Sequence, residues 1–91
     1  MSTAMTKDAI LAAAQEELTN VAPDLADETI PPDADLREVF DLDSMDFLNW
    51  FTALHRRLGV DIPELDYPRL RSLDDVATYL ADRRGGHSGR E

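Results

Sequence analysis

Asp41-Leu42-Asp43-Ser44-Met45-Asp46 ends a long loop and opens a helix with a strongly apolar face, and the rest of the fold is arranged around this junction. Ser44 is a residue type that caps helix N-termini, since its hydroxyl can accept a backbone N–H that the first turn leaves unpaired. After it, apolar residues recur at spacings of three and four, which places them on one helix face: Phe47, Phe51, Leu54 and Leu58. The stretch therefore predicts a helix over 44–58, with Ser44 as its N-cap and the serine hydroxyl presented to solvent.

The composition favours a carrier, adaptor or binding module over an enzyme. The 91 residues can bury one modest core, but not a core and a deep, walled active site. The 19 acidic and 9 basic residues give a formal net charge of −10, which argues against nucleic acid as a partner and favours basic proteins. Without cysteine the chain has no disulfide and no thiolate to serve as metal ligand or nucleophile, and we expect no metal centre.

The lengths of the apolar runs indicate whether the protein is exported or spans a membrane. Residues 1–7 contain no apolar signal-peptide core, and no apolar run approaches the roughly 18 to 20 residues that span a bilayer. The sequence therefore predicts a soluble, cytoplasmic protein without a membrane span, and we expect a monomer.

Three further helices are predicted from apolar periodicity and from end signals. Thr6 suits the N-cap of a helix over 6–19, which Asn20 and Pro23 end. A short helix fits 64–70, and Ser72 suits the N-cap of a last helix over 72–84.

The segment 24–43 reads as a long first loop, with a helical turn at 36–40. Its apolar residues predict that it is anchored to the core: Ile30, Leu36, Val39, Phe40 and Leu42. Gly59 suits a left-handed C-cap for the helix over 44–58.

The whole chain is predicted to be an all-α protein, a small four-helix bundle of three long helices and one short. The bundle forms a single domain over 1–84, followed by a disordered tail at 85–91.

Four segments, taken together and in this order, resemble the acyl carrier protein family over nearly the whole chain up to residue 84: residues 30–36 (IPPDADL), 42–46 (LDSMD), 58–63 (LGVDIP) and 72–76 (SLDDV). The triplet Asp-Ser-Met is common by chance, so the resemblance rests on the combination. It implies the same four-helix bundle with a long first loop. It also implies that Ser44 carries phosphopantetheine, installed from coenzyme A by a phosphopantetheinyl transferase.

The resemblance implies a protein that is not an enzyme but holds acyl, or aminoacyl, intermediates as thioesters for a dedicated lipid or secondary-metabolite pathway. Its partners would then be an acyl or aminoacyl ligase and synthase or transferase enzymes. A serine hydrolase is disfavoured, because a nucleophile needs a base within hydrogen-bond reach. His55 would lie roughly 16 Å along the same helix, at about 1.5 Å per residue. An unmodified acidic interaction module of the same fold stays open.

The surface around Ser44 is the candidate docking surface for partners. Carboxylates beside the serine suit a basic transferase, although a solvated acidic face is the simpler interpretation. The candidate docking residues are Asp41, Asp43, Met45, Asp46, Leu48, Asn49, Thr52, His55 and Arg56. The last two, followed by Arg57, make this half of the helix neutral to basic. That departs from the acidic helix of typical family members and indicates dedicated partners rather than the housekeeping fatty acid synthase.

Four apolar residues of the same helix line either the core or a cleft for an acyl chain: Phe47, Trp50, Phe51 and Leu54. Core packing is the simpler interpretation. A cleft between helices would shelter an acyl chain with a gain of roughly 0.8 kcal/mol for each methylene. In the alternative, two bulky aromatic residues in one helix would leave little room and would favour a short or polar cargo, and the sequence leaves both alternatives open.

Overall fold

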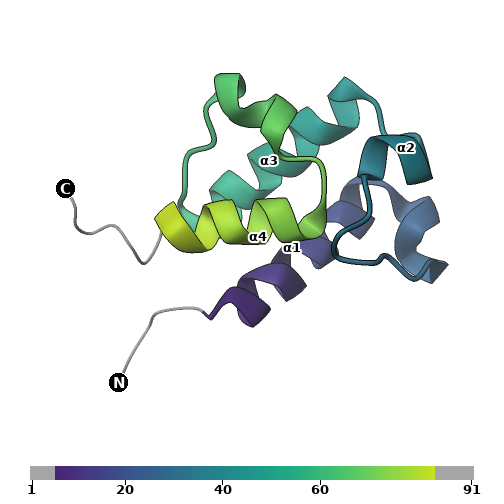
Figure 1. Cartoon of the computed structure of the whole chain (residues 1–91), viewed down its shortest axis with the longest axis horizontal. Coiled ribbons are helices and arrows are strands. Elements are labelled where there is room, and N and C mark those ends of the chain that lie inside the picture. The colour runs from purple at the N-terminus through teal and green to yellow at the C-terminus, as the bar shows by residue number, and fades with distance from the viewer. Residues whose placement is uncertain (1–5, 84–91) are drawn as a thin grey trace.

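Three helices form the body of the molecule (Figure 1): α1 (Lys7–Val21), α3 (Ser44–Leu58) and α4 (Leu73–Ala81). The connections contain one short helix and two 3-10 helices: α2 (Leu36–Phe40), η1 (Pro23–Asp27) and η2 (Glu64–Arg69). The computed structural model describes residues 6–83, so the tail predicted at 85–91 lies outside the described residues. Residues 6–83 contain no strand, which confirms the predicted all-α bundle with a long first loop.

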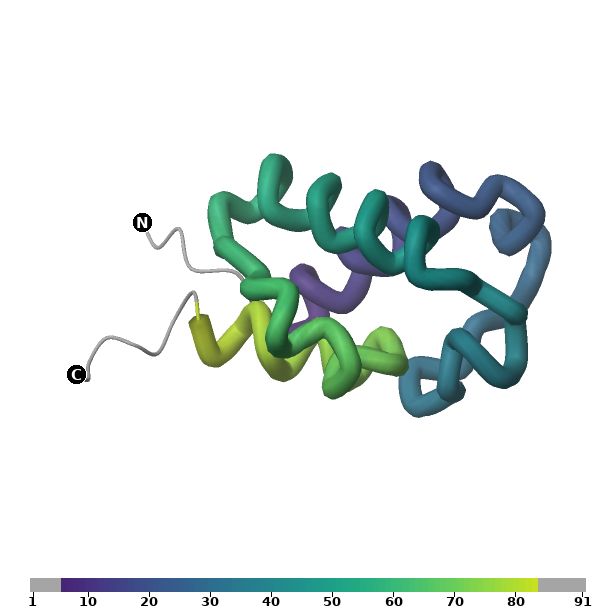
Figure 2. The backbone as a smooth tube through the Cα atoms, turned by 90° about the horizontal axis from the view of Figure 1, so that it is seen from above, coloured from purple at the N-terminus to yellow at the C-terminus, as the bar shows by residue number. Residues whose placement is uncertain are grey.

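Helix α1 packs against both α4 and α3. Figures 1 and 2 show the long first loop, with η1 and α2, at the end of the bundle opposite to the end where α1 begins and α4 ends. The start of α3 lies at this loop end, next to α2. Ser44 is therefore positioned where the loop returns to the bundle.

The helix ends follow from capping. Thr6 Oγ1 accepts the Ala9 N–H at 3.1 Å and Ser72 Oγ accepts the Asp75 N–H at 3.0 Å, so both predicted N-caps are confirmed. Gly59, with a φ of 71°, confirms the predicted left-handed end of α3.

Three boundaries differ from the predicted ranges. Helix α1 continues to Val21 instead of ending at 19, because the restriction imposed by Pro23 acts on the residue just before it. The segment 64–70 is a 3-10 helix that ends at Arg69, since Pro68 inside it lacks the N–H that an α-helix would use. The α-helical part of α4 ends at Ala81 and continues as a π-helical turn over 82–83, while the predicted end at 84 lies outside the described residues.

The first loop is anchored by apolar side chains and by backbone hydrogen bonds to the start of α4. Ile30, Leu36 and Leu42 are buried, and Phe40 is half-buried against the core. The Leu36 N–H donates to the Arg71 carbonyl and the Asp74 N–H to the Pro32 carbonyl, both at 2.8 Å. The prediction of Val39 as an anchor was wrong: it is 59% exposed, because a helix as short as α2 turns only one side to the core.

The centre of the core is the indole of Trp50. The ring is fully buried, stacks on Phe51 with ring centroids 5.3 Å apart, and donates its Nε1–H to the Ala14 carbonyl at 2.9 Å. A buried indole N–H needs such a partner, and this one joins α3 to α1. The hydrogen bond thus restrains the rotation of α3, the helix that begins at Ser44, against α1.

Candidate functional site

Ser44 is the first residue of α3, not its N-cap, and this corrects the sequence-based prediction. The cap is Asp43, whose Oδ1 accepts the Asp46 N–H at 3.0 Å, while Asp46 Oδ2 accepts the Asp43 N–H at 3.3 Å. This reciprocal pair is a capping box. A carboxylate is at least as good a cap as a hydroxyl, and here Asp43 takes the position that Ser44 was expected to fill.

The Ser44 hydroxyl is therefore left free. The residue is exposed, and within residues 6–83 its side chain makes no hydrogen bond. It stands at the N-terminus of a 15-residue helix, where unpaired N–H groups and the positive end of the helix dipole favour a negatively charged group. The start of the helix therefore favours a phosphate ester at this serine.

A cavity of about 240 Å³ opens beside Ser44. It lies between α2, the start of α3, η2 and the segment that leads into α4, and its lining is Arg37, Ser44, Phe47, Tyr67, Pro68, Leu70 and Arg71. Phe47 and Leu70 are buried and Tyr67 is half-buried, whereas the two arginines are exposed. The cavity thus has apolar inner walls and a cationic rim.

The aromatic rings of this wall belong to one cluster. Tyr67 packs on Phe51 with centroids 4.7 Å apart, and the Arg37 guanidinium carbon lies 5.4 Å from the centroid of Phe47. Burial, followed by the negative charges of Glu64 and Asp61, raises the pKa of Tyr67, so this phenol stays neutral at physiological pH.

The four residues predicted to line either core or cleft are all buried: Phe47, Trp50, Phe51 and Leu54. Phe47 lines the cavity, while the indole of Trp50 is directed at α1 through its hydrogen bond. The structure therefore divides this set, with one member beside the cavity and the fully buried Trp50 at the centre of the core.

The structure places the predicted docking residues on the exposed side of α3 and in the segment just before it. Asp46 is half-buried and the others are exposed: Asp41, Asp43, Met45, Leu48, Asn49, Thr52, His55 and Arg56. Met45 and Leu48 are apolar side chains exposed to 59% and 39%, next to the carboxylates around Ser44. This surface is therefore mixed apolar and acidic at the serine end.

The far half of α3 is less basic than the sequence indicates. Arg57 Nη1 lies 2.7 Å from Glu16 Oε1 and 2.9 Å from Glu17 Oε2 of α1, and hydrogen bonds to Glu16 and then Glu17 raise the pKa of Arg57. His55 Nδ1 lies 3.8 Å from Asp61 Oδ1. Arg56 is the α3 cation without an ion pair among the described residues.

Sequence reasoning missed Arg37, Arg71, Tyr67 and Leu70 as neighbours of Ser44. The four come from segments distant in the chain, and their approach depends on how the first loop and η2 are folded back. One signal was available: in a chain of net charge −10, Arg37 directly follows the family-like segment 30–36 and Arg71 directly precedes the segment 72–76.

The one histidine of residues 6–83 lies away from Ser44. His55 pairs with Asp61 at the other end of α3 from Ser44. Residues 6–83 hold no group of three or more His, Cys, Asp or Glu side chains that could bind a metal ion. In the same range no helix is long and apolar enough to cross a bilayer.

Comparisons with known proteins identify the family of the chain. A family model described as "Phosphopantetheine attachment site" matches residues 8–80. The acyl carrier protein of Campylobacter hominis is 33% identical over 64 residues, which is 70% of this chain and 76% of that protein. The solution structure of an acyl-carrier-like protein from Anaplasma phagocytophilum has the same fold, with a TM-score of 0.78 at 24% identity, over 92% of this chain and 98% of that one.

The fold and the family model define the class of this protein as helical domains to which phosphopantetheine is attached, since the model spans most of the chain. The chain belongs to the acyl carrier protein family. Proteins of this family are carriers rather than catalysts, and they act with transferases and synthases.

Proposed function

We propose that this protein is a discrete carrier that holds acyl intermediates as thioesters on a phosphopantetheine arm attached to Ser44. The observation that carries the proposal is the free, exposed hydroxyl of Ser44 at the start of α3, released from capping by Asp43 and adjoining the cavity. The same serine lies inside the segment 8–80 that matches the phosphopantetheine attachment model.

The residues around Ser44 fit such a group. When bound, phosphopantetheine supplies a flexible arm that ends in a thiol, which this cysteine-free chain lacks. The reciprocal hydrogen bonds of Asp43 and Asp46 stabilise the first turn of the helix that presents the serine to a modifying enzyme. The N-terminal N–H groups of α3 offset the negative charge of a phosphodiester. A tethered intermediate meets each partner at an effective concentration of roughly millimolar.

The partner surface in this proposal is the exposed side of α3. A basic phosphopantetheinyl transferase, using coenzyme A, would dock on the carboxylates of Asp41, Asp43 and Asp46 and on the apolar side chains of Met45 and Leu48. Opposite charges speed the encounter, and the apolar contacts slow dissociation. Ligase and synthase or transferase enzymes would use the same surface in turn. A monomeric state and a cytoplasmic location stay predictions.

The cargo in this proposal is a short acyl group. The cavity of about 240 Å³ is smaller than the roughly 300 to 1,000 Å³ of typical ligand sites. An aminoacyl cargo would bring its cationic amine toward Arg37 and Arg71, so it is the less favoured alternative. Arg56, which has no carboxylate partner among the described residues, supports a dedicated pathway. Equal processing of this loaded carrier and of an ordinary acidic one by housekeeping ketosynthase and reductase enzymes would contradict that assignment.

Intact-mass measurement tests the attachment. Incubation of the protein with coenzyme A and a phosphopantetheinyl transferase should add one phosphopantetheine to the wild type and none to Ser44→Ala. Ser88 lies outside the described residues and stays unmodified in this proposal. A wild-type mass that does not change with any of several transferases would favour an unmodified interaction module of the same fold.

A further inference from the structure

Two arginines stand at the rim of the cavity beside Ser44 in a chain whose net charge is −10. Most other cations of residues 6–83 are paired with carboxylates. Arg37 is different: within the described residues it has no ion pair, and its guanidinium lies over the ring of Phe47. A cation that is left without a carboxylate in so acidic a protein is available to an anion from outside the described residues.

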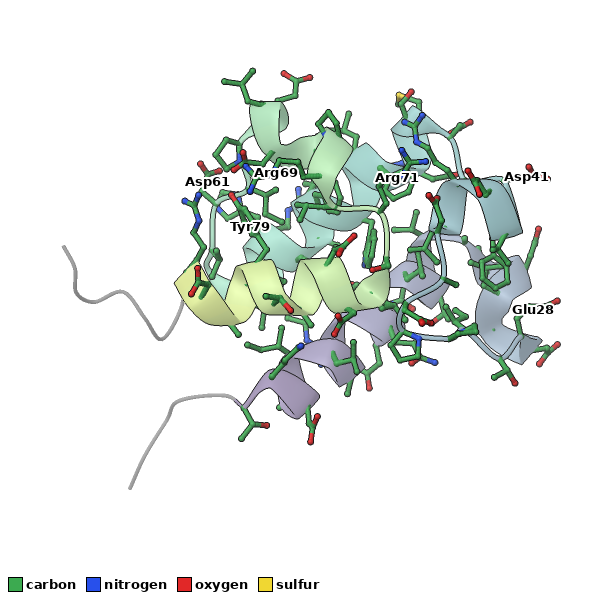
Figure 3. All side chains as sticks on the ribbon, viewed as in Figure 1. Glu28, Asp41, Asp61, Arg69, Arg71 and Tyr79 are labelled. Atoms are coloured by element: carbon green, nitrogen blue, oxygen red, sulfur yellow. The ribbon has the colours of Figure 1, made fainter. Side chains whose placement is uncertain are left out.

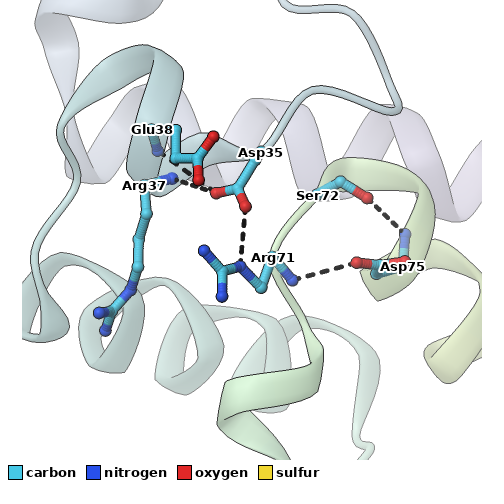
Figure 4. A network of polar contacts seen from close by, with 6 residues as sticks. All are labelled: Asp35, Arg37, Glu38, Arg71, Ser72 and Asp75. Carbon is cyan, nitrogen blue, oxygen red and sulfur yellow. Dashed lines mark hydrogen bonds and ion pairs between the residues drawn. The ribbon is translucent and has the colours of Figure 1, made fainter.

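Arg71 is held in place by its own network (Figure 4). Its Nε donates to Asp35 Oδ2 at 2.8 Å, its backbone N–H to Asp75 Oδ2 at 3.2 Å, and its carbonyl accepts the Leu36 N–H at 2.8 Å. The terminal nitrogens of the guanidinium make no hydrogen bond within residues 6–83. One edge of the guanidinium is therefore used for positioning, and the other remains free to donate.

Asp35 is the residue that positions Arg71. Its Oδ1 caps α2 by accepting the N–H groups of Arg37 and Glu38, at 3.0 and 3.3 Å, while its Oδ2 faces Arg71. One carboxylate thus fixes both the helix that carries Arg37 and the side chain of Arg71. The two cations reach the same cavity from segments that this carboxylate joins.

We propose that Arg37 and Arg71 form a binding site for the phosphodiester that joins the arm to Ser44. This inference rests on the proposed attachment at Ser44. Hydrogen bonds from a guanidinium group to phosphate oxygens are stronger than those between neutral groups, because both partners are charged. The planar donors of the guanidinium also match the geometry of the anion. The surrounding carboxylates would otherwise repel a phosphodiester at this serine, and the two arginines offset that repulsion.

The distribution of charged and apolar residues in the cavity affects which cargo it can hold. The charge lies at the rim, where Ser44 is, and the inner wall is formed by Phe47, Leu70 and Tyr67. A phosphodiester held at the rim directs the arm across the mouth of the cavity. The acyl group then has an apolar space in reach, whereas a carboxylate at the end of the cargo would find no cation inside.

The test compares apo and phosphopantetheinylated protein for the wild type, Arg37→Gln and Arg71→Gln. The matched control is Arg69→Gln, which removes the same charge from the same region. Arg69 pairs with Asp66 and points toward Asp61 and Tyr79, away from Arg71 (Figure 3). Modification should raise the melting temperature, and each rim variant should lose roughly 4 °C of that rise. The phosphorus NMR resonance of the rim variants should move toward that of free phosphopantetheine, and the Arg69→Gln resonance should not.

Arg37→Gln keeps the test decisive even if Arg71→Gln weakens the fold, because Arg37 has no ion pair to lose. An unchanged rise and an unchanged phosphorus resonance in both rim variants would overturn the inference. Loading with butyryl and succinyl groups separates the arm from its cargo. An arginine-dependent rise found with succinyl alone would assign the site to a cargo carboxylate and overturn the phosphodiester. A wild type that is never modified would contradict the proposed function itself, and its unchanged mass distinguishes that failure.

Discussion

Asp43 caps the helix that Ser44 begins, and this division between two neighbouring residues leaves the serine hydroxyl available. The Asp43 carboxylate accepts the Asp46 N–H, so removal of Asp43 unpairs a helix-end donor, whereas removal of the Ser44 hydroxyl unpairs nothing in the described residues. Asp43→Ala should lower the free energy of unfolding by roughly 1 kcal/mol. Ser44→Ala should change it by less than about 0.5 kcal/mol. Urea unfolding followed by circular dichroism measures both, and an equal loss in the two variants would return the capping role to Ser44.

Asp35 gives stability that depends on pH. Partial burial favours its neutral form, but the hydrogen bond from Arg71 and those from the Glu38 and Arg37 N–H groups outweigh burial, so the pKa of Asp35 is lowered. A carboxylate with a lowered pKa in the folded state stabilises the fold above its unfolded pKa, and this stability is lost as pH falls through the folded pKa.

Asp35→Asn separates that charge from the cap, because asparagine caps a helix about as well as aspartate. The variant should melt below the wild type at pH 7, and the two melting curves should converge as pH falls through the lowered carboxyl pKa. Glu28→Gln, at an exposed position without an ion pair among the described residues, is the control and should run parallel to the wild type. A difference in melting temperature between Asp35→Asn and the wild type that stays constant with pH would show that packing, and not charge, causes the loss of stability.

At the scale of the elements, the packing of α3 on α1 depends on Trp50. Its ring is fully buried and its Nε1–H is bound to the Ala14 carbonyl. Trp50→Phe keeps an aromatic ring but removes this hydrogen bond and part of the buried volume, and should cost roughly 2 kcal/mol of unfolding free energy. The exposed Thr52→Ala on the same helix should cost nothing measurable. A loss below about 0.5 kcal/mol for Trp50→Phe would mean that another contact sets the rotation of α3.

The elements also show what sequence can predict here and what it cannot. Thr6, Ser72 and Gly59 act on their own neighbours, and each was predicted correctly because capping is local. Ser44 was misassigned because two good capping residues stand side by side, and only the backbone shows which of them leaves the helix. Asp41 ends α2 with a φ of 56°. Aspartate tolerates this left-handed conformation, but its presence in a sequence does not predict it.

The cavity rim lies beyond prediction for a different reason. Arg71 and Asp35 are joined across 36 positions of sequence, and Arg37 meets Ser44 only because α2 folds against the start of α3. Such contacts depend on the combined backbone conformation of several turns, and no periodic pattern in the sequence predicts them. The family was therefore predictable from the sequence motifs, whereas the charges that surround Ser44 were not.

At the scale of the whole molecule, the wall of the cavity is supported from the far end of the bundle. Tyr79 on α4 donates its O–H to Asp66 Oδ2 of η2 at 2.6 Å, and Arg83 Nη2 lies 3.6 Å from the same oxygen. Burial, followed by the hydrogen bond to Asp66, raises the pKa of Tyr79 to about 12. This hydrogen bond is therefore intact at physiological pH, and it ties η2, which supplies Tyr67 and Pro68 to the cavity, to α4.

The net charge of −10 acts across the entire molecule. The radius of gyration is 12.8 Å, while the Debye length falls from about 30 Å at 0.01 M salt to about 8 Å at 0.15 M. At low salt every carboxylate therefore repels those on the opposite side, and at physiological salt repulsion is confined to neighbours. The exposed ion pairs are also weakened by salt, but each contributes only about 0 to 1 kcal/mol.

Because repulsion prevails, the melting temperature should rise with sodium chloride over this range by roughly 4 to 8 °C, the equivalent of about 1 kcal/mol for a domain of this size. Magnesium chloride at equal ionic strength should do no more, since residues 6–83 hold no group of side chains suited to a metal ion. Differential scanning calorimetry measures both. A melting temperature that falls with sodium chloride would mean that the ion pairs joining the helices outweigh the excess of carboxylates. A larger rise with magnesium would instead reveal direct binding of the ion to the acidic surface around Ser44.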